Sequence, residues 1–155
     1  MSKTLELYDR EEFYRCLQCA VCTGSCPAAR VIENYNPREI ILKYILNREQ
    51  EVMLKTDIIW CCTTCRICEE RCPHGIHINS LLTHIKNLAA KCGNLPDALR
   101  QSIMQIAQTG RPIQATPRSE RIRLELGLKP LENLEVEEIR KIFLKAGLGE
   151  ILELK

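Results

Sequence analysis

The sequence predicts an all-α fold, and three observations support this prediction. Apolar residues recur at helical spacing between two clusters of cysteines and again after the second cluster. Residues that favour helix ends bracket these segments, with Asn, Pro or acidic residues at their starts and Gly at their ends. No run alternates apolar and polar residues over the length that a half-buried β-strand needs.

The two helices nearest the cysteines have the clearest patterns. We expect the first over residues 36–48, where Asn36 suits the N-cap and Pro37 suits the first helical position. We expect the second to begin at Ile78 and to end just before Gly93, since glycine readily adopts the left-handed backbone that ends a helix.

Three further helices are expected over residues 96–108, 117–126 and 135–146. In the first of these, Leu99, Ile103 and Ile106 are expected to face inward, and Gly110 follows its end. Gly127 is expected to stop the second. The last has acidic residues in its first turn and lysines toward its end, an order that complements the helix dipole.

Composition and charge exclude several classes of function. The chain has 155 residues with 22 Lys and Arg against 20 Asp and Glu, so it lacks the basic excess of a nucleic-acid-binding protein. Residues 1–10 carry charges throughout and have no apolar segment of the kind found in signal peptides. The longest uncharged stretches, residues 16–29 and 72–85, are too short and polar to span a bilayer. We therefore expect a cytoplasmic protein.

Ten cysteines are the unusual feature of the composition, and eight of them form one motif used twice. The first run reads Cys16-x2-Cys19-x2-Cys22-x3-Cys26-Pro27 and the second reads Cys62-x2-Cys65-x2-Cys68-x3-Cys72-Pro73. This is the spacing with which two-cluster ferredoxins bind a pair of [4Fe–4S] clusters. Three cysteines spaced three apart let a short loop curl over one cluster.

The fourth cysteine of each run comes one residue later than that period and points elsewhere. In this motif it ligates the other cluster. One cluster is therefore expected on Cys16, Cys19, Cys22 and Cys72, and the other on Cys62, Cys65, Cys68 and Cys26. Zinc is the weaker alternative because two pairs of cysteines suffice for it, and disulfides are disfavoured in a reducing compartment.

The remaining thiols and imidazoles are expected to be bystanders. Cys61 and Cys92 are interpreted as small buried apolar residues. The three histidines, His74, His77 and His84, are expected around the second cluster as neighbours and not as ligands, because cysteines already complete both sites. Trp60 is expected to pack over that cluster.

No sequence for phosphate or dinucleotide binding is present, and no nucleophile is paired with a base. A chain with two clusters and no substrate site is expected to relay electrons between other subunits and to have no catalytic residue of its own. We expect residues 1–93 to bind the clusters and residues 94–155 to form a helical extension for partner docking. Its basic residues, Arg111, Arg118, Arg121, Arg123 and Lys129, form either a docking face for an acidic partner or an ordinary solvated surface.

The two cysteine runs, the Trp60-x-Cys62 approach and a tail with Arg121, Leu126-Gly127-Leu128 and Pro130 resemble the small, C-type iron–sulfur subunit of the soluble heterodisulfide reductases of methanogens. This family belongs to the helical ferredoxin class. The resemblance implies a relay between two partner subunits. One contains flavin and iron–sulfur clusters and is supplied by a hydrogenase or formate dehydrogenase. The other is catalytic and reduces the coenzyme M–coenzyme B heterodisulfide of methanogenesis.

The cysteine runs alone also resemble iron–sulfur subunits of succinate dehydrogenase and anaerobic glycerol-3-phosphate dehydrogenase. The alternative is therefore a relay subunit of another oxidoreductase complex, quinone-linked or active in sulfur metabolism. One residue departs from the pattern, because Ala20 stands where a glycine is expected after the second cysteine.

Overall fold

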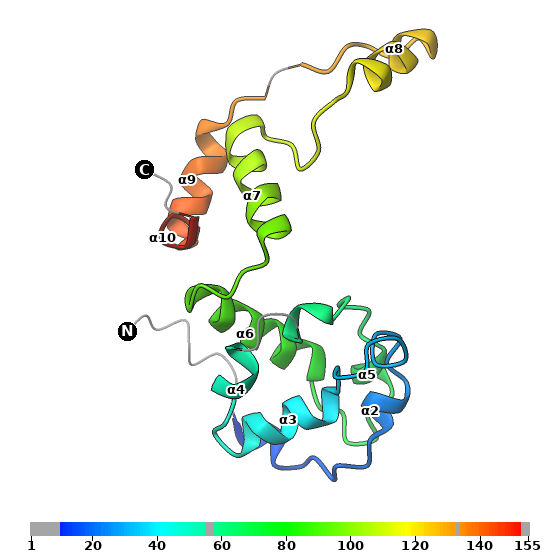
Figure 1. The fold of residues 1–155 in the computed structure, drawn as a ribbon, viewed down its shortest axis with the longest axis vertical. Coiled ribbons are helices and arrows are strands. Elements are labelled where there is room, and N and C mark those ends of the chain that lie inside the picture. Colours follow the sequence, from blue (N-terminus) through cyan, green and yellow to red (C-terminus); the bar gives the residue numbers. More distant parts are fainter. Residues whose placement is uncertain (1–9, 55–57, 133, 153–155) are drawn as a thin grey trace. The chain divides into compact units, whose positions relative to one another are not determined.

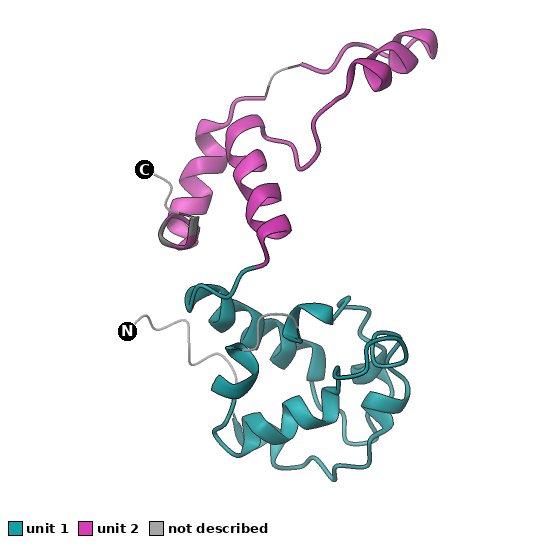
Figure 2. Ribbon diagram, in the orientation of Figure 1, with its two compact units in different colours: residues 1–95 teal, residues 96–155 magenta. Residues whose placement is uncertain are grey.

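The computed structural model describes residues 10–54, 58–132 and 134–152 of the chain. The predicted all-α class is confirmed, because the described residues form helices and include no strand. The chain divides into two compact units, Met1–Leu95 and Pro96–Lys155 (Figure 2). Each unit is described by itself below.

The first unit contains two longer helices and several single turns (Figure 1). Its elements are α1 (Arg10–Phe13), α2 (Val21–Gly24), α3 (Pro37–Ile45), α4 (Gln50–Met53), η2 (Ile59–Cys61), α5 (Ile67–Glu70) and α6 (Ile78–Lys91). Both helices predicted in this part are confirmed as α3 and α6. The Asn36 side chain caps α3 by accepting a hydrogen bond from the Glu39 N–H at 3.2 Å. The helix ends earlier than predicted because Asn47 takes a left-handed conformation.

The hydrophobic core of this unit lies between α3 and α6 and the short helices around them. Helix α3 contacts α1, α2 and α4, whereas α6 contacts α4, η2 and α5. Apolar side chains from these elements, including Phe13, Ile41, Ile59, Leu81 and Ile85, are fully buried. This burial supplies most of the hydrophobic stabilisation of the unit.

The first unit repeats one arrangement twice, a single-turn helix followed by a longer helix. Helices α2 and α5 contact each other, and each also contacts the longer helix that follows it (Figure 1). The Thr23 hydroxyl of α2 accepts a hydrogen bond from the Arg38 N–H at 3.0 Å. The Glu69 carboxylate of α5 accepts one from the Asn79 N–H, also at 3.0 Å. Both donors are the second residue of their helix, so the two halves are tied in the same way.

The second unit is built from α7 (Asp97–Thr109), α8 (Pro117–Glu125), α9 (Glu137–Lys145) and α10 (Leu148–Leu152). The first three correspond to the predicted helices, whereas α10 is not among them. Helix α9 packs against α7 and α10. Helix α8 begins with a capping box between Thr116 and Ser119 and buries none of its side chains.

The prediction that Leu99 faces inward is wrong, because its side chain is 42% exposed. Ile103 and Ile106 are half-buried, and Ala107 is the buried residue of α7. The apolar stripe of α7 is wider than the surface that α9 covers, so the end of the stripe at the first turn remains in solvent.

Candidate cluster-binding sites

Each cysteine run folds as a loop followed by a single helical turn. The third cysteine of each run lies in that turn, Cys22 in α2 and Cys68 in α5. The first two cysteines precede the turn, and the fourth follows it. The two loops therefore present their thiols in equivalent places.

Both loops bend through left-handed backbone at the same two positions. Gln18 and Thr64 have φ of 55° and 57°, and Ala20 and Arg66 have φ of 64° and 62°. This conformation costs a non-glycine residue about 1–2 kcal/mol. Ala20 adopts the glycine-like backbone even though it carries a side chain. Strain of this kind is typical of functional loops, and here it curls each loop so that its thiols face one space.

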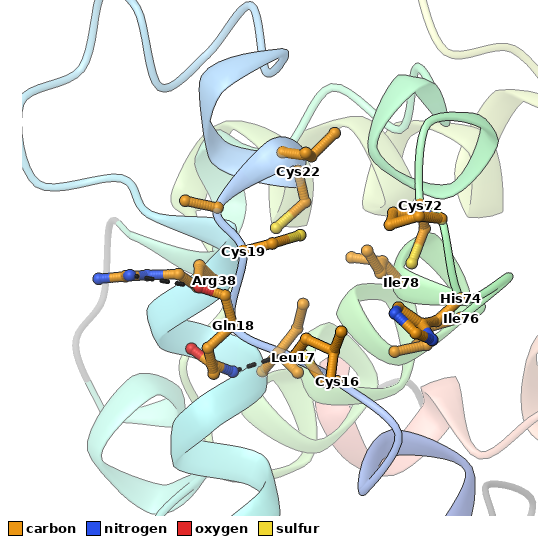
Figure 3. A pocket seen from close by; sticks show the side chains of 14 residues that line it. Cys16, Leu17, Gln18, Cys19, Cys22, Arg38, Cys72, His74, Ile76 and Ile78 are labelled. Atoms are coloured by element: carbon orange, nitrogen blue, oxygen red, sulfur yellow. Dashed lines mark hydrogen bonds between the residues drawn. The ribbon is translucent and has the colours of Figure 1, made fainter.

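One pocket of the first unit is lined by Cys16, Cys19, Cys22 and Cys72. Figure 3 shows Cys19 and Cys22 on one wall and Cys72 on the opposite wall, with their sulfur atoms directed into the space between them. The Gln18 side-chain amide donates a hydrogen bond to the Cys16 sulfur at 3.3 Å. The structure thus brings three thiols of the first run together with the last thiol of the second.

The other thiols gather around Tyr35, which lies just before α3. The thiols of Cys62, Cys26 and Cys68 all contribute to a raised pKa of its hydroxyl, so they lie close to it. The Cys62 sulfur accepts a hydrogen bond from the Thr64 N–H at 3.4 Å. Cys65 lies in the same loop and is exposed. This second group contains the last thiol of the first run.

The two groups of thiols adjoin each other. Cys22 and Cys26 both contribute to the raised pKa of Cys68, so they lie close to it. Helix α2 also contacts α5. Cys22 and Cys68 are each 8% exposed, whereas Cys19 and Cys65 lie at the surface. Each group therefore has a buried side toward the other group and an open side toward solvent.

The chemistry of these thiols suits a cationic iron core. Burial, followed by the neighbouring Cys62 thiol, raises the pKa of Cys68 to about 12. Burial likewise raises the pKa of Cys22. Such thiols become thiolates when a metal centre supplies the compensating positive charge. The buried Tyr35 hydroxyl, which has no hydrogen-bond partner among the described residues, also fits an acceptor bound among Cys62, Cys26 and Cys68.

Comparison with known proteins gives the same cofactor. The family model "4Fe-4S dicluster domain" matches residues 12–76, which contain both cysteine runs. The chain is 33% identical over 133 residues to a C-type iron–sulfur subunit of the CoB–CoM heterodisulfide reductase of Methanocaldococcus jannaschii, covering 82% of this chain and 70% of that protein. The chain belongs to the family of C-type iron–sulfur subunits of heterodisulfide reductase. It is a two-cluster iron–sulfur protein, as predicted.

Other members of this heterodisulfide reductase family show similar agreement. The corresponding iron–sulfur subunit of Methanopyrus kandleri is 40% identical over 113 residues, which cover 73% of this chain and 58% of that protein. The C-type subunit of the H2:CoB–CoM heterodisulfide,ferredoxin reductase of Methanothermobacter marburgensis is 31% identical over 143 residues, which cover 88% of this chain and 76% of that protein. The chain thus spans less than two thirds of the Methanopyrus relative's length.

The sequence-based placement of two residues in this heterodisulfide reductase subunit is wrong. Cys92 is expected to be buried but is exposed, because it follows the last turn of α6 where the apolar stripe ends. His74 is expected beside the second cluster but lines the pocket of Cys16, because it closely follows Cys72, which forms a wall of that pocket (Figure 3). Cys61 is half-buried against the core.

The other two histidines lie away from the pocket. His77 is exposed and lies 2.9 Å from the Glu12 carboxylate. His84 is 8% exposed and meets the Tyr44 ring edge-on, and burial lowers its pKa. The Trp60 indole donates a hydrogen bond to the Asn94 carbonyl at 3.0 Å. The contact between Trp60 and a cluster stays a prediction.

The basic residues of the second unit are not all available to a partner. Arg111 and Arg123 each donate to a backbone carbonyl of their own unit, that of Glu132 and that of Lys129. Arg118 and Arg121 of α8 are exposed. In the described part of the chain, no helix has the length and apolarity needed to cross a bilayer.

Proposed function

We propose that this chain relays electrons within a heterodisulfide reductase complex. It receives electrons from a flavin-containing partner and passes them to a catalytic partner that reduces the coenzyme M–coenzyme B heterodisulfide. The observation that carries this proposal is the adjacency of two thiol groups with buried inner sides and solvent-facing outer sides. A relay needs this arrangement, because electrons enter and leave at the surface and cross between sites inside.

The proposed ligands are crosswise between the two runs. Cys16, Cys19, Cys22 and Cys72 hold the first cluster, and Cys62, Cys65, Cys68 and Cys26 hold the second. The shared pocket of the first four thiols supports this assignment. The grouping of Cys26 with Cys62 and Cys68 around Tyr35 supports it for the second set. Each cluster, when bound, accepts and releases one electron.

The protein surroundings of each site fix the thiols and screen them from water. The Gln18 amide and the Thr64 N–H donate hydrogen bonds to the first thiol of each run. Such hydrogen bonds stabilise negative charge on sulfur and so favour the reduced state. Ile41 and Ile78 line the first pocket and restrict the access of water to it.

We further propose a division of labour between the two units. Residues 1–93 bind both clusters, and residues 94–155 dock a partner protein of the complex. The second unit leaves large apolar side chains exposed on successive helices, including Leu124, Leu126, Ile142 and Leu144. These side chains support the proposed docking role, because a partner protein would bury them.

The donor and the location belong to the same proposal. The Methanococcus maripaludis relative is named as part of an H2/formate:CoB–CoM heterodisulfide,ferredoxin reductase, and we propose a hydrogenase or formate dehydrogenase as the electron source here. We propose the cytoplasm as the location, because the ten cysteines form no disulfide in the described structure and cysteines without disulfides are typical of a reducing compartment.

The test is electron delivery within the purified complex. Anaerobically purified chain should contain about eight iron and eight sulfide ions, as two cubane clusters require. Reduction of the flavin-containing partner should then produce the electron resonance signals of this chain's clusters, and a complex lacking the chain should not reduce heterodisulfide. Zinc in place of iron, or clusters that stay oxidised beside a reduced flavin, would contradict the proposal.

A further inference from the structure

Tyr35 is a buried side chain whose hydroxyl lacks a partner. The residue is 2% exposed, and its hydroxyl oxygen forms no hydrogen bond with any described residue. A hydroxyl removed from water without a hydrogen bond is destabilising. This buried hydroxyl therefore requires an acceptor, which a cluster-ligating thiolate sulfur would supply better than a neutral thiol.

The surroundings of the hydroxyl identify the class of acceptor. Among the neighbouring thiols, Cys62 has the largest effect on the pKa of the hydroxyl, followed by Cys26 and Cys68. Three of the four ligands proposed for the second cluster thus surround one O–H group. A phenol is protonated at neutral pH, so the Tyr35 hydroxyl acts as a donor.

The first site has a hydrocarbon at the matching place. Tyr35 directly precedes Asn36, the N-cap of α3, and Ile76 directly precedes His77, the N-cap of α6. Ile76 is 1% exposed and lines the pocket of Cys16 (Figure 3). The two halves share their loop conformation and their helix ties, so tyrosine and isoleucine are a difference in chemistry at one matching position.

We propose that Tyr35 donates a hydrogen bond to the Cys62 sulfur at the occupied second site and raises the reduction potential of that site. This inference rests on the crosswise ligand assignment of the proposed function. A hydrogen bond to sulfur disperses the negative charge that reduction adds, so it favours the reduced form. Reduction adds one electron and no proton, because the hydroxyl keeps its hydrogen.

The test is Tyr35→Phe in the full chain carrying both clusters. Midpoint potentials are measured by redox titration followed by electron resonance, and each signal is assigned by its loss in Cys19→Ala or Cys65→Ala. We expect the equilibrium constant for reduction of the second cluster to fall about tenfold. Its midpoint potential should therefore fall by about 59 mV for one electron. The first cluster should not change.

Tyr44→Phe is the matched control. Tyr44 is also buried and lies on α3, but its ring contacts Phe13 and His84. This variant should leave both potentials unchanged. Unchanged potentials in Tyr35→Phe, or a shift confined to the first cluster, would overturn the proposal.

A second measurement covers the case in which Tyr35→Phe fails to assemble its clusters. Biosynthetic 3-fluorotyrosine makes the hydroxyl a stronger donor, so it should raise the potential of the second cluster in the full chain. No rise there would overturn the proposal. A wrong ligand assignment would be recognised separately, because Cys72→Ala would then remove the signal of the second cluster and spare the first.

Discussion

The Glu69 carboxylate accepts a hydrogen bond from the backbone N–H of Asn79 at 3.0 Å, which ties the turn that carries Cys68 to the start of α6. The Glu69 side chain is only 8% exposed and also pairs with Arg66, a left-handed residue of the same loop, at 2.6 Å. A single carboxylate therefore connects the strained loop, the ligand-bearing turn and the first turn of the long helix.

Replacing this carboxylate should loosen the second site. Glu69→Ala leaves a helix N-terminus without its acceptor, and the loss of such a group costs about 1 kcal/mol. We expect the second cluster to be released faster in the presence of an iron chelator, as followed by visible absorbance. Glu70→Ala removes an exposed neighbour in the same turn and should leave the release rate unchanged. Equal rates in the two variants would contradict this role of Glu69.

The proposed crosswise ligand set predicts which cluster each cysteine supports. Cys72→Ala should abolish the electron resonance signal of the cluster that we propose on Cys16, Cys19 and Cys22, because Cys72 lies on the opposite wall of their pocket. Cys92→Ala should preserve both signals, since that thiol is exposed at the end of α6. Survival of the first cluster without Cys72 would refute the assignment.

The left-handed conformation of Ala20 predicts a stabilising substitution. Glycine adopts this backbone without the penalty of a Cβ atom, so Ala20→Gly should raise the midpoint of thermal unfolding by an amount equivalent to about 1 kcal/mol. Ala90→Gly in the last turn of α6 should have the opposite sign. Both midpoints are compared by anaerobic circular dichroism at one scan rate. A destabilised Ala20→Gly variant would show that the loop strain is not the controlling quantity.

His84 gives the first unit a specific dependence on pH. Burial lowers the pKa of His84 in the folded chain. The ordinary pKa of histidine is about 6.5. Below this pH the imidazole is therefore protonated in the unfolded chain but stays neutral in the folded chain until the pH is lower. Stability should therefore fall as the pH decreases from about 7.5 to about 5.5. In His84→Asn the fall in melting temperature over this interval should be smaller.

Local sequence patterns predict the long helices but not the short ones. Asn36 with Pro37, and the glycine at position 93, mark ends that depend on local backbone chemistry alone, and the structure has them there. Helices α2 and α5 have four residues each, too few for a periodic pattern, and each follows a left-handed residue that is not glycine. Their existence depends on the tertiary ties of Thr23 and Glu69.

The sites can be predicted as sets of cysteines, but their surroundings cannot. Spacing alone selects the eight cysteines of the two runs. The place of His74 depends on where the chain runs after Cys72, and the place of Tyr35 depends on the packing of α3. Leu99 shows the same limit in the second unit, because an apolar stripe does not specify how much of it a neighbour covers.

Substitution of Gly110 tests whether the two units unfold independently of each other. It has a φ of 72°, and a Cβ atom there would lie 2.8 Å from the Leu134 side chain, so Gly110→Ala combines backbone strain with a close contact. Gly127 has a φ of 71° with open space around it, which makes Gly127→Ala a control for the strain alone. Strain alone costs about 1–2 kcal/mol, and Gly110→Ala should exceed the control by about a further 1 kcal/mol. We expect the loss of helical circular dichroism from the second unit to move to lower temperature, while the visible absorbance of the clusters keeps its midpoint. A common shift of both signals would instead show that the two units unfold together.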